Sequence, residues 1–186
     1  MPRLFIALEL PDAVKDALMR MCAGVPGAKW RKHDQLHLTL RFIGEVDGGL
    51  ARDIAEALTL VRAPGFELAL RGIGHFGDGR RPRVLWAGVD TAEPVRFLHD
   101  RIERVLGDVG LPSERRKFRP HVTLARLNGV RMHHVTEFES HFGGYRSPGF
   151  PVHGFTLFSS FLSRDGAIYT PEADYPLVPA QAHSGA

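Results

Sequence analysis

The stretch HLTL at His37–Leu40, together with its near copy HVTL at His121–Leu124, decides how this chain folds. Each stretch alternates a polar residue with an aliphatic one, so in a β-strand the His and Thr side chains share one face and the aliphatic pair shares the other. The copies lie 84 residues apart (121 minus 37), and the same offset takes Phe66 to Phe150, where two further strand-like stretches begin. This shared offset indicates an internal duplication.

The composition is that of a soluble globular protein with a proper core. With 186 residues the chain suffices for one domain, or for two small lobes that share an interface. Hydrophobic residues make up 44% and charged residues 24%, and no apolar run approaches the roughly eighteen residues of a membrane span. The N-terminus lacks the long apolar stretch and small-residue cleavage site of a secretory signal. We therefore expect a cytoplasmic protein without a membrane partner.

The single cysteine, Cys22, limits the possible chemistry. One cysteine cannot form an intramolecular disulfide or a multi-cysteine zinc site. It falls in a predicted amphipathic helix, where we interpret it as a small buried hydrophobe. His133, His134 and His141 lie near one predicted helix without a carboxylate in the usual metalloprotease arrangement, so they predict a solvated face. The sequence therefore predicts no metal and no cofactor.

Basic residues are clustered, although the formal net charge is only +3. The clusters lie at 29–32, 80–83 and 115–119, and two of them are close in sequence to the histidine stretches. Clusters of this kind favour a partner that carries phosphate groups. The clusters at Arg80–Arg83 and Arg115–Arg119 further favour an oligonucleotide.

The pattern of apolar residues, glycines and prolines predicts a repeated order of elements. Residues 72–82 hold four glycines and a proline, which predicts a loop between two halves. The predicted strands are 3–10, 28–30 (a short extended piece), 36–43, 66–71, 84–89, 118–127 and 152–159, and the predicted helices are 11–22, 50–61, 94–109 and 132–142.

Each half therefore reads strand, helix, motif strand, helix, strand, which predicts an α+β fold. We expect one bilobal domain over residues 1–170, with pseudo-repeats at about 3–75 and 83–160. Two antiparallel sheets would line a central cleft, with the helices packed outside. Residues 171–186, rich in Pro and Ala, are expected to form a flexible tail.

The paired His and Thr side chains suit displacement at phosphorus. Two imidazoles aimed at one point from opposite sides can remove a proton from the attacking oxygen and give a proton to the leaving oxygen. The hydroxyl groups of Thr39 and Thr123 can donate hydrogen bonds to non-bridging phosphate oxygens. Neither step requires a metal.

The two stretches resemble the paired signatures of the 2H phosphoesterase superfamily. The flanking sequences Arg3–Leu8, Leu38–Glu45, Phe118–Arg126 and Leu157–Ser160 are similar to its RNA 2′,3′-cyclic phosphodiesterase branch, once called 2′-5′ RNA ligase. The similarity runs from Arg3 to about Thr170. The resemblance implies the bilobal fold and metal-independent hydrolysis of a 2′,3′-cyclic phosphate at an RNA end, leaving a 2′-phosphate.

The resemblance also implies roles for individual residues. His37 would be the proton donor and His121 the proton acceptor, and Thr39 and Thr123 would bind the phosphate. Arg126 matches a family arginine implicated in substrate binding, although simple alternation from His121 points it to the opposite face. Phe42 occupies the matching position after the first stretch, where it could contact substrate by stacking on a base or lie in the core.

Two other readings stay open at this point. The same two histidines could serve a 2′-5′ RNA ligase or a 2′-5′ oligonucleotide phosphodiesterase, which sequence does not separate. A non-catalytic module that binds RNA or nucleotides is the reading from another class, although it has no need of both proton carriers. We expect the chain to act as a monomer on RNA or on a nucleotide 2′,3′-cyclic phosphate.

Overall fold

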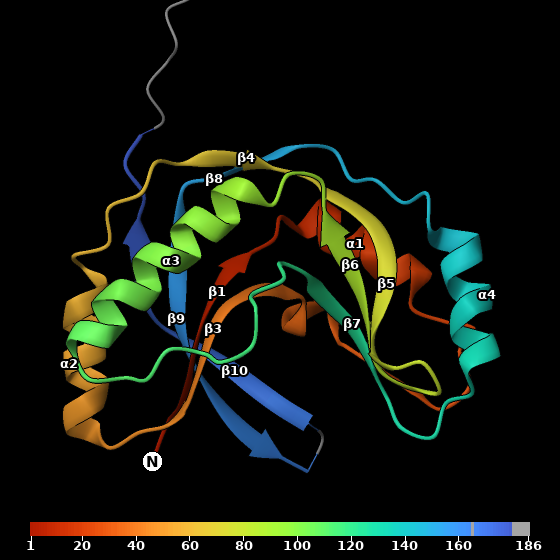
Figure 1. Cartoon of the computed structure of the whole chain (residues 1–186), viewed down its shortest axis with the longest axis horizontal. Helices are drawn as coiled ribbons and strands as arrows, with labels where there is room; N and C mark the ends of the chain where they lie inside the picture. The colour runs from red at the N-terminus through yellow and green to blue at the C-terminus, as the bar shows by residue number, and fades with distance from the viewer. Residues whose placement is uncertain (165, 180–186) are drawn as a thin grey trace, which may run out of the picture.

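The computed structural model describes residues 1–164 and 166–179 and has an α+β fold, as expected (Figure 1). The helices are α1 (Asp12–Met21), the single-turn 3₁₀ helix η1 (His33–Gln35), α2 (Gly48–Leu58), α3 (Glu93–Asp108) and α4 (Met132–Phe142). The strands are β1 (Arg3–Glu9), β2 (Ala28–Trp30), β3 (His37–Glu45), β4 (Phe66–Leu68), β5 (Leu70–Asp78), β6 (Arg81–Val89), β7 (Val122–Leu127), β8 (Phe150–Val152), β9 (Gly154–Ser163) and β10 (Gly166–Pro176).

The main sheet is continuous but has a narrow waist. Its strand order is β10-β9-β1-β3-β7-β6-β5, with β2 added to β7, and all of its named pairings are antiparallel. The pair of β3 with β7 consists of Leu38 with Val122 alone. The sequence predicted two separate sheets, whereas this one contact joins the two halves into a single sheet. β4 and β8 form a second, two-stranded sheet.

Residues that pair across the centre of the molecule are separated by the offset of the sequence repeat. Leu38 pairs with Val122, and Glu67 of β4 pairs with Pro151 of β8. Both separations are 84 residues (122 minus 38, and 151 minus 67). A twofold relation between duplicated halves predicts this pairing, because equivalent residues then face each other across the axis.

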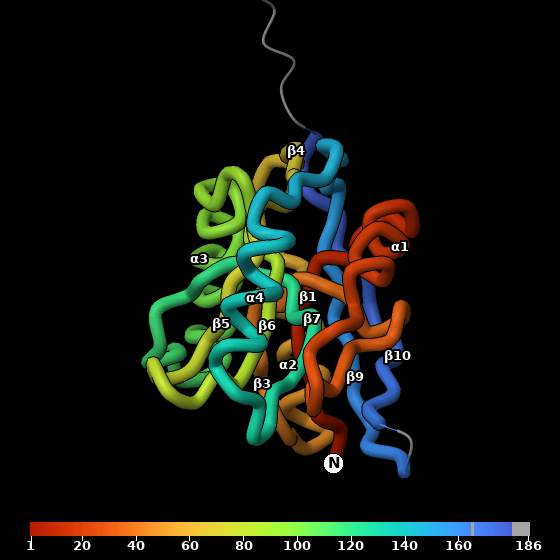
Figure 2. The backbone as a smooth tube through the Cα atoms, turned by 90° about the vertical axis from the view of Figure 1, so that its right-hand side faces the viewer, coloured from red at the N-terminus to blue at the C-terminus, as the bar shows by residue number. Residues whose placement is uncertain are grey.

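The helices bury amphipathic stripes against the sheet. In α1 the buried residues are Val14, Leu18 and Met21, at helical spacing. The Asp47 side chain caps α2 by accepting hydrogen bonds from the backbone N–H groups of Gly49 and Leu50 at 2.8 and 2.9 Å. Figure 1 shows α2 and α3 at one side of the molecule and α1 and α4 at the other, and Figure 2 shows α1 and α4 from their own side.

The predicted loop at 72–82 is wrong, because these residues form most of the β5–β6 hairpin. Gly74 lies in β5 where a Cβ atom would meet the Trp86 ring at 2.4 Å, so the ring of the neighbouring strand takes the place of a side chain. Gly77, with φ +147°, accompanies a register shift between Phe76 and Gly77. The glycines therefore accommodate strand packing here instead of ending the strand.

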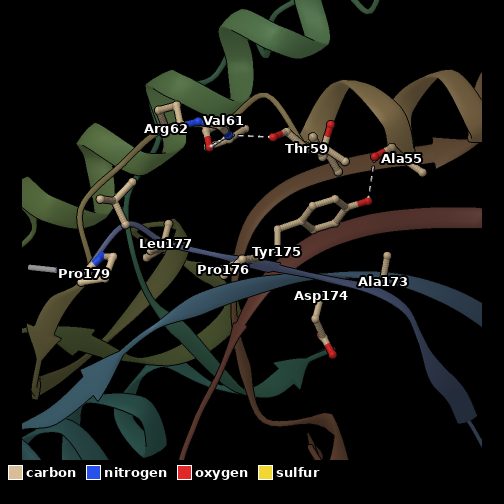
Figure 3. A pocket seen from close by; sticks show the side chains of 12 residues that line it. Ala55, Thr59, Val61, Arg62, Ala173, Asp174, Tyr175, Pro176, Leu177 and Pro179 are labelled. Atoms are coloured by element: carbon tan, nitrogen blue, oxygen red, sulfur yellow. Dashed lines mark hydrogen bonds between the residues drawn. The ribbon is translucent and has the colours of Figure 1, made fainter.

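The predicted flexible tail starts too early. Residues 171–176 belong to β10, which pairs with β9. Tyr175 is buried, and its hydroxyl donates a hydrogen bond to the Ala55 carbonyl of α2 at 3.0 Å (Figure 3). Val178 then forms a parallel bridge with Pro64. Prolines are tolerated here because β10 is an edge strand; residues 180–186 of the predicted tail lie outside the described residues.

Among residues 1–164 and 166–179, no helix has the length and apolar character that crossing a membrane requires.

Candidate active site

The four motif side chains gather on one face of the sheet at its waist. His37 is the first residue of β3, and His121 directly precedes β7. Because Leu38 pairs with Val122 in antiparallel register, position 39 is set opposite 121 and position 37 opposite 123. The alternate residues Leu38 and Val122 are fully buried on the other face. The structure thus brings together two imidazoles and two hydroxyls, each His opposite the other strand's Thr.

A cleft of about 760 Å³ opens on this face. It is lined by Thr39, Phe42, Phe76, His121 and Thr123, and its rim carries the cations Arg96, Arg116, Lys117 and Arg119 together with Glu114. Part of the basic cluster predicted at 115–119 therefore lies at the cleft. Positive charge at the mouth of a cleft favours an anionic ligand.

A second hollow has nearly the same size but different chemistry. It measures about 700 Å³ and lies between the end of α2 and residues 173–179 (Figure 3). Its walls are mainly apolar and include no motif residue. The arrangement of chemical groups, not the volume, therefore identifies the first cleft as the candidate active site.

His37 lies among aromatic rings. Its ring stacks on Phe5 with centroids 5.0 Å apart and meets the edge of Tyr169 at 5.3 Å. Its Nε2 atom lies 3.1 Å from Thr39 Oγ1. The ring of His37 also forms a hydrogen bond with the backbone of Gln35. Burial, assisted by the positive charge of Arg31, lowers the pKa of His37 to about 4. The free protein therefore holds His37 neutral at pH 7.

His121 has a similar backbone partner but a different cover. Its Nδ1 donates a hydrogen bond to the Arg119 carbonyl at 2.6 Å, which leaves Nε2 as the nitrogen that can exchange a proton with a ligand. The edge-on ring of Phe76 lies 4.8 Å away between centroids. Burial lowers the pKa of His121 as well, and the charge of Arg119 acts in the same direction. Each ring is thus oriented by a backbone group two residues upstream, at Gln35 for His37 and at Arg119 for His121.

Matching β-bulges lie just after both motifs. In β3 the register passes from Thr39 with Ala7 to Arg41 with Ile6, so Leu40 is the extra residue. In β7 it passes from Thr123 with Trp86 to Ala125 with Leu85, so Leu124 is the extra residue. A bulge resets the alternation of side chains. Phe42 and Arg126, the next outward positions, consequently share the face of the histidines.

The bulge resolves the difficulty with Arg126. Without it, Arg126 would point to the core face with Leu124, whereas the structure pairs it with the cleft-lining residue Val84 and leaves it exposed. Arg126 is not itself among the side chains that line the cleft. Phe42 does line the cleft and is 48% exposed, which argues against a core position.

Sequence reasoning missed the aromatic side chains around the histidines. Phe5, Phe158 and Tyr169 surround His37, and Phe76 contacts His121. Only Phe5 carried a usable signal, because alternation in 3–10 puts it opposite the core residues Leu4 and Ile6. Tyr169 comes from a strand that was not predicted.

Three histidines outside the two motifs have partners of their own. His33 Nε2 lies 3.0 Å from Asp16, His75 Nδ1 lies 2.6 Å from Glu139, and the ring of His99 stacks on Phe118 at 4.0 Å. Within residues 1–164 and 166–179 there is no group of three or more His, Cys, Asp or Glu side chains placed to hold a metal ion.

Comparison with known proteins places this geometry in context. The model of the family described as the 2′-5′ RNA ligase superfamily matches residues 5–163. A relative from Aeropyrum pernix, named RNA 2′,3′-cyclic phosphodiesterase, is 39% identical over 148 residues, which cover 78% of this chain and 84% of the relative. A relative of the same name from Thermus thermophilus is 35% identical over 181 residues, covering 90% and 86%.

Solved structures agree in fold over nearly the whole chain. E. coli LigT complexed with 3′-AMP superposes with a TM-score of 0.77 at 26% identity, covering 95% of this chain and 99% of LigT. The protein TT0787 of Thermus thermophilus superposes with a TM-score of 0.73 at 31% identity, covering 94% and 97%.

Proposed function

Because this chain belongs to the 2′-5′ RNA ligase superfamily, we propose that it is an RNA 2′,3′-cyclic phosphodiesterase that hydrolyses cyclic phosphate ends to 2′-phosphates without a metal. The observation that supports the proposal is the antiparallel pairing of Leu38 with Val122, which sets the two His-x-Thr stretches side by side next to a cationic cleft lined by His121 and both threonines. His37 does not line this cleft itself, but it is close enough to His121 for the charge of that ring to act on it. Two proton carriers on either side of one phosphorus are what in-line displacement needs.

In the proposed reaction a water attacks phosphorus as the bond to the 3′ oxygen breaks. Nε2 of His121, left free by the Nδ1 bond to Arg119, takes a proton from the water. His37 gives a proton to the departing 3′ oxygen. The products are a 3′ hydroxyl and a 2′-phosphate, and the two imidazoles end with their proton states exchanged.

His37 must be protonated for this role, although burial lowers its pKa to about 4 in the free protein. A phosphate anion near the ring favours the imidazolium, since an opposite charge within about 4–6 Å raises the pKa of a histidine. We therefore expect the negative charge of bound substrate to raise the pKa of His37, so that the ring takes up a proton when substrate binds. The Thr39 hydroxyl oxygen, 3.1 Å from Nε2, can accept a hydrogen bond from the protonated ring until the proton passes to the leaving 3′ oxygen.

The surrounding polar groups support a phosphate ligand. Thr39 and Thr123 line the cleft and can donate to the non-bridging oxygens. Arg96, Arg116, Lys117 and Arg119 can offset the charge of the phosphate. Phe42, which lines the cleft, is proposed to contact a base, and Arg126, which is on the same face but outside the cleft walls, is proposed to contact the sugar-phosphate backbone of the substrate.

The test is hydrolysis of a short RNA with a 2′,3′-cyclic phosphate, in the presence of a chelator, followed by phosphorus NMR of the product. We expect a 2′-phosphate, with rates lowered about 10²–10⁴-fold by His37→Ala or by His121→Ala, the size of one acid–base contribution. Circular dichroism of each variant checks its fold. Unchanged turnover by the double variant would contradict the mechanism, and a 3′-phosphate product would contradict the proposed leaving group.

The superfamily description also names RNA ligation across a 2′-5′ bond, which would use the same two histidines in the reverse direction. Comparing rates of cyclic phosphate hydrolysis with rates of 2′-5′ cleavage and joining separates these activities. A protein that binds the RNA for hours without product would instead support the binding-module reading.

All side chains of the proposed active site come from one chain, so we propose that the monomer is active. Analytical ultracentrifugation at the protein concentration of the activity measurement tests this. We also propose a cytoplasmic location, because RNA ends are met inside the cell; fractionation of cells that produce the protein tests this.

A further inference from the structure

We propose that three cations, Arg31, Lys29 and Arg126, form a track for the RNA backbone that leads away from the catalytic histidines along β2 and β7. This track would bind phosphates upstream of the terminal cyclic phosphate, so the substrate would be a strand of several nucleotides. The inference rests on the proposed function for the identity of the ligand. None of the basic clusters in the sequence singled out this combination, because Arg126 lies far from 29–31 in the chain.

The track lies on the catalytic face. Lys29 is the direct cross-strand partner of Arg126, and the flanking pairs are Ala28 with Leu127 and Trp30 with Ala125. Leu127 and Ala125 are buried in the core, so Lys29 and Arg126 occupy the opposite face. The bulge at Leu124 puts that face in line with Thr123 and His121.

The pairing of Lys29 with Arg126 has an energetic cost. Like charges directly opposite each other on neighbouring strands destabilise a sheet. Across residues 1–164 and 166–179, Lys29, Arg31 and Arg126 form no ion pair with an acidic side chain, which they share with most Lys and Arg side chains of those ranges. What distinguishes Lys29 and Arg126 is that they lie directly opposite each other, so an anion from outside the chain would relieve their repulsion.

The track is connected to the site at one end. Arg31 donates its backbone N–H to the Leu124 carbonyl at 2.8 Å, which holds the residue beside the bulge, and its charge acts on the ring of His37. At the other end the track stops at the facing pair of Lys29 and Arg126. Positive charge therefore extends from His37 along β2 to Arg126.

The position of the track implies a long ligand. The three cations of the track lie outside the walls of the cleft. The reacting phosphate inside the cleft is already faced by other cations, namely Arg96, Arg116, Lys117 and Arg119. A mononucleotide that fills the cleft has no further phosphate for the track. Only a strand with upstream nucleotides can reach both.

The test compares Lys29→Gln with the matched control Arg52→Gln, which removes one exposed positive charge from α2. Binding is measured by fluorescence anisotropy with an eight-nucleotide single-stranded RNA that ends in a 3′-phosphate, so no turnover is needed. We expect Lys29→Gln to weaken binding about fivefold at 0.1 M salt and to reduce the slope of log K against log salt by about 0.7. Arg52→Gln should change neither.

Turnover separates the two proposals. With the cyclic phosphate substrates, we expect Lys29→Gln to lower kcat/KM for the oligonucleotide more than for the mononucleotide. Equal affinity and salt slope for Lys29→Gln and Arg52→Gln would overturn the track, even if the enzyme is active. Equal competition by poly-glutamate of matched length and charge would also overturn it, in favour of an acidic polypeptide. Wild-type protein that binds RNA through Lys29 but turns over no cyclic phosphate would instead overturn the proposed function and leave the track standing.

Discussion

The two histidines occupy equivalent positions in the repeat but differ in their surroundings. His37 is covered by rings of Phe5 and Tyr169, whereas His121 meets Phe76 and lines the cleft itself. Each is oriented by a backbone group two residues upstream, at Gln35 and at Arg119. The two rings therefore differ in their aromatic neighbours and in their access to the cleft, which is the kind of asymmetry that the proposed acid and base roles require.

The burial of His37 predicts how stability depends on pH. Its pKa is lowered from the usual 6.5 to about 4 in the folded state, so the unfolded chain binds the proton more readily between these values. The contribution is fully present above pH 6.5 and is lost as the pH falls toward 4, by roughly 3 kcal/mol. Urea unfolding of the wild type and of His37→Asn at pH 7 and pH 4 measures this; the same pH-induced loss in both proteins would contradict it.

Phe42 should act in binding more than in stability. It is 48% exposed and lines the cleft, so Phe42→Ala removes a stacking surface for a base, about 1–3 kcal/mol of binding. We expect a higher KM for the cyclic phosphate substrate with little change in unfolding free energy. Phe97→Ala on α3, where the side chain is 45% exposed, is the matched control. A large stability loss with unchanged KM would show a core role instead.

At the scale of elements, the bulge at Leu40 also turns Arg41 into the protein. Arg41 is 6% exposed; its Nε lies 3.0 Å from Glu103 of α3, its Nη1 lies 3.5 Å from Glu114, and its Nη2 donates to the Pro112 carbonyl at 2.5 Å. The equivalent position in the second motif strand is Ala125. Arg41 thus holds the motif strand β3 against α3 and against the segment that leads to the cations lining the cleft.

Removing Arg41 should destabilise the protein strongly. Arg41→Ala leaves Glu103, whose side chain is 15% exposed, without its charged partner, and breaking a buried pair from one side costs about 3–5 kcal/mol. Thermal and urea unfolding measure the loss. Arg41→Lys keeps the charge but not the planar set of donors, so it should restore only part of the stability. A loss below about 1 kcal/mol for Arg41→Ala would mean that the network contributes little to stability.

The two halves of the sheet do not correspond to the two sequence repeats at about 3–75 and 83–160. From the end of the chain, β9 pairs with β1 and β10 pairs with β9. From the first half, β2 pairs with β7 of the second half. Helix α3 packs on α2 and β3, and α4 packs on β5 and β6. On either side of the β3–β7 junction, the sheet therefore holds strands from both halves of the chain, and the two motif stretches lie at this junction.

The summed charge of the catalytic face predicts a steep salt dependence. Four cations line the cleft and three more form the track, although the net charge is only +3. If four to seven phosphates are contacted, the slope of log K against log salt for single-stranded RNA should lie between about −3 and −5. Anisotropy titrations from about 50 to about 300 mM salt measure this slope, and a flat response would contradict binding of an oligonucleotide backbone.

The sequence by itself determined the motif strands, the four helices to within a few residues and the α+β class, because these depend on the local period of apolar side chains. It also named His37, Thr39, His121 and Thr123, which the structure brings to one face. Only the tertiary structure decided the bulges at Leu40 and Leu124, the aromatic cover from β10 and the junction of the two halves at Leu38 and Val122. A bulge is defined by the register of the partner strand, so the strand's own sequence carries no period that reveals it. The contacts of His37 with Phe158 and Tyr169 join residues more than a hundred positions apart, so local sequence does not reveal them either.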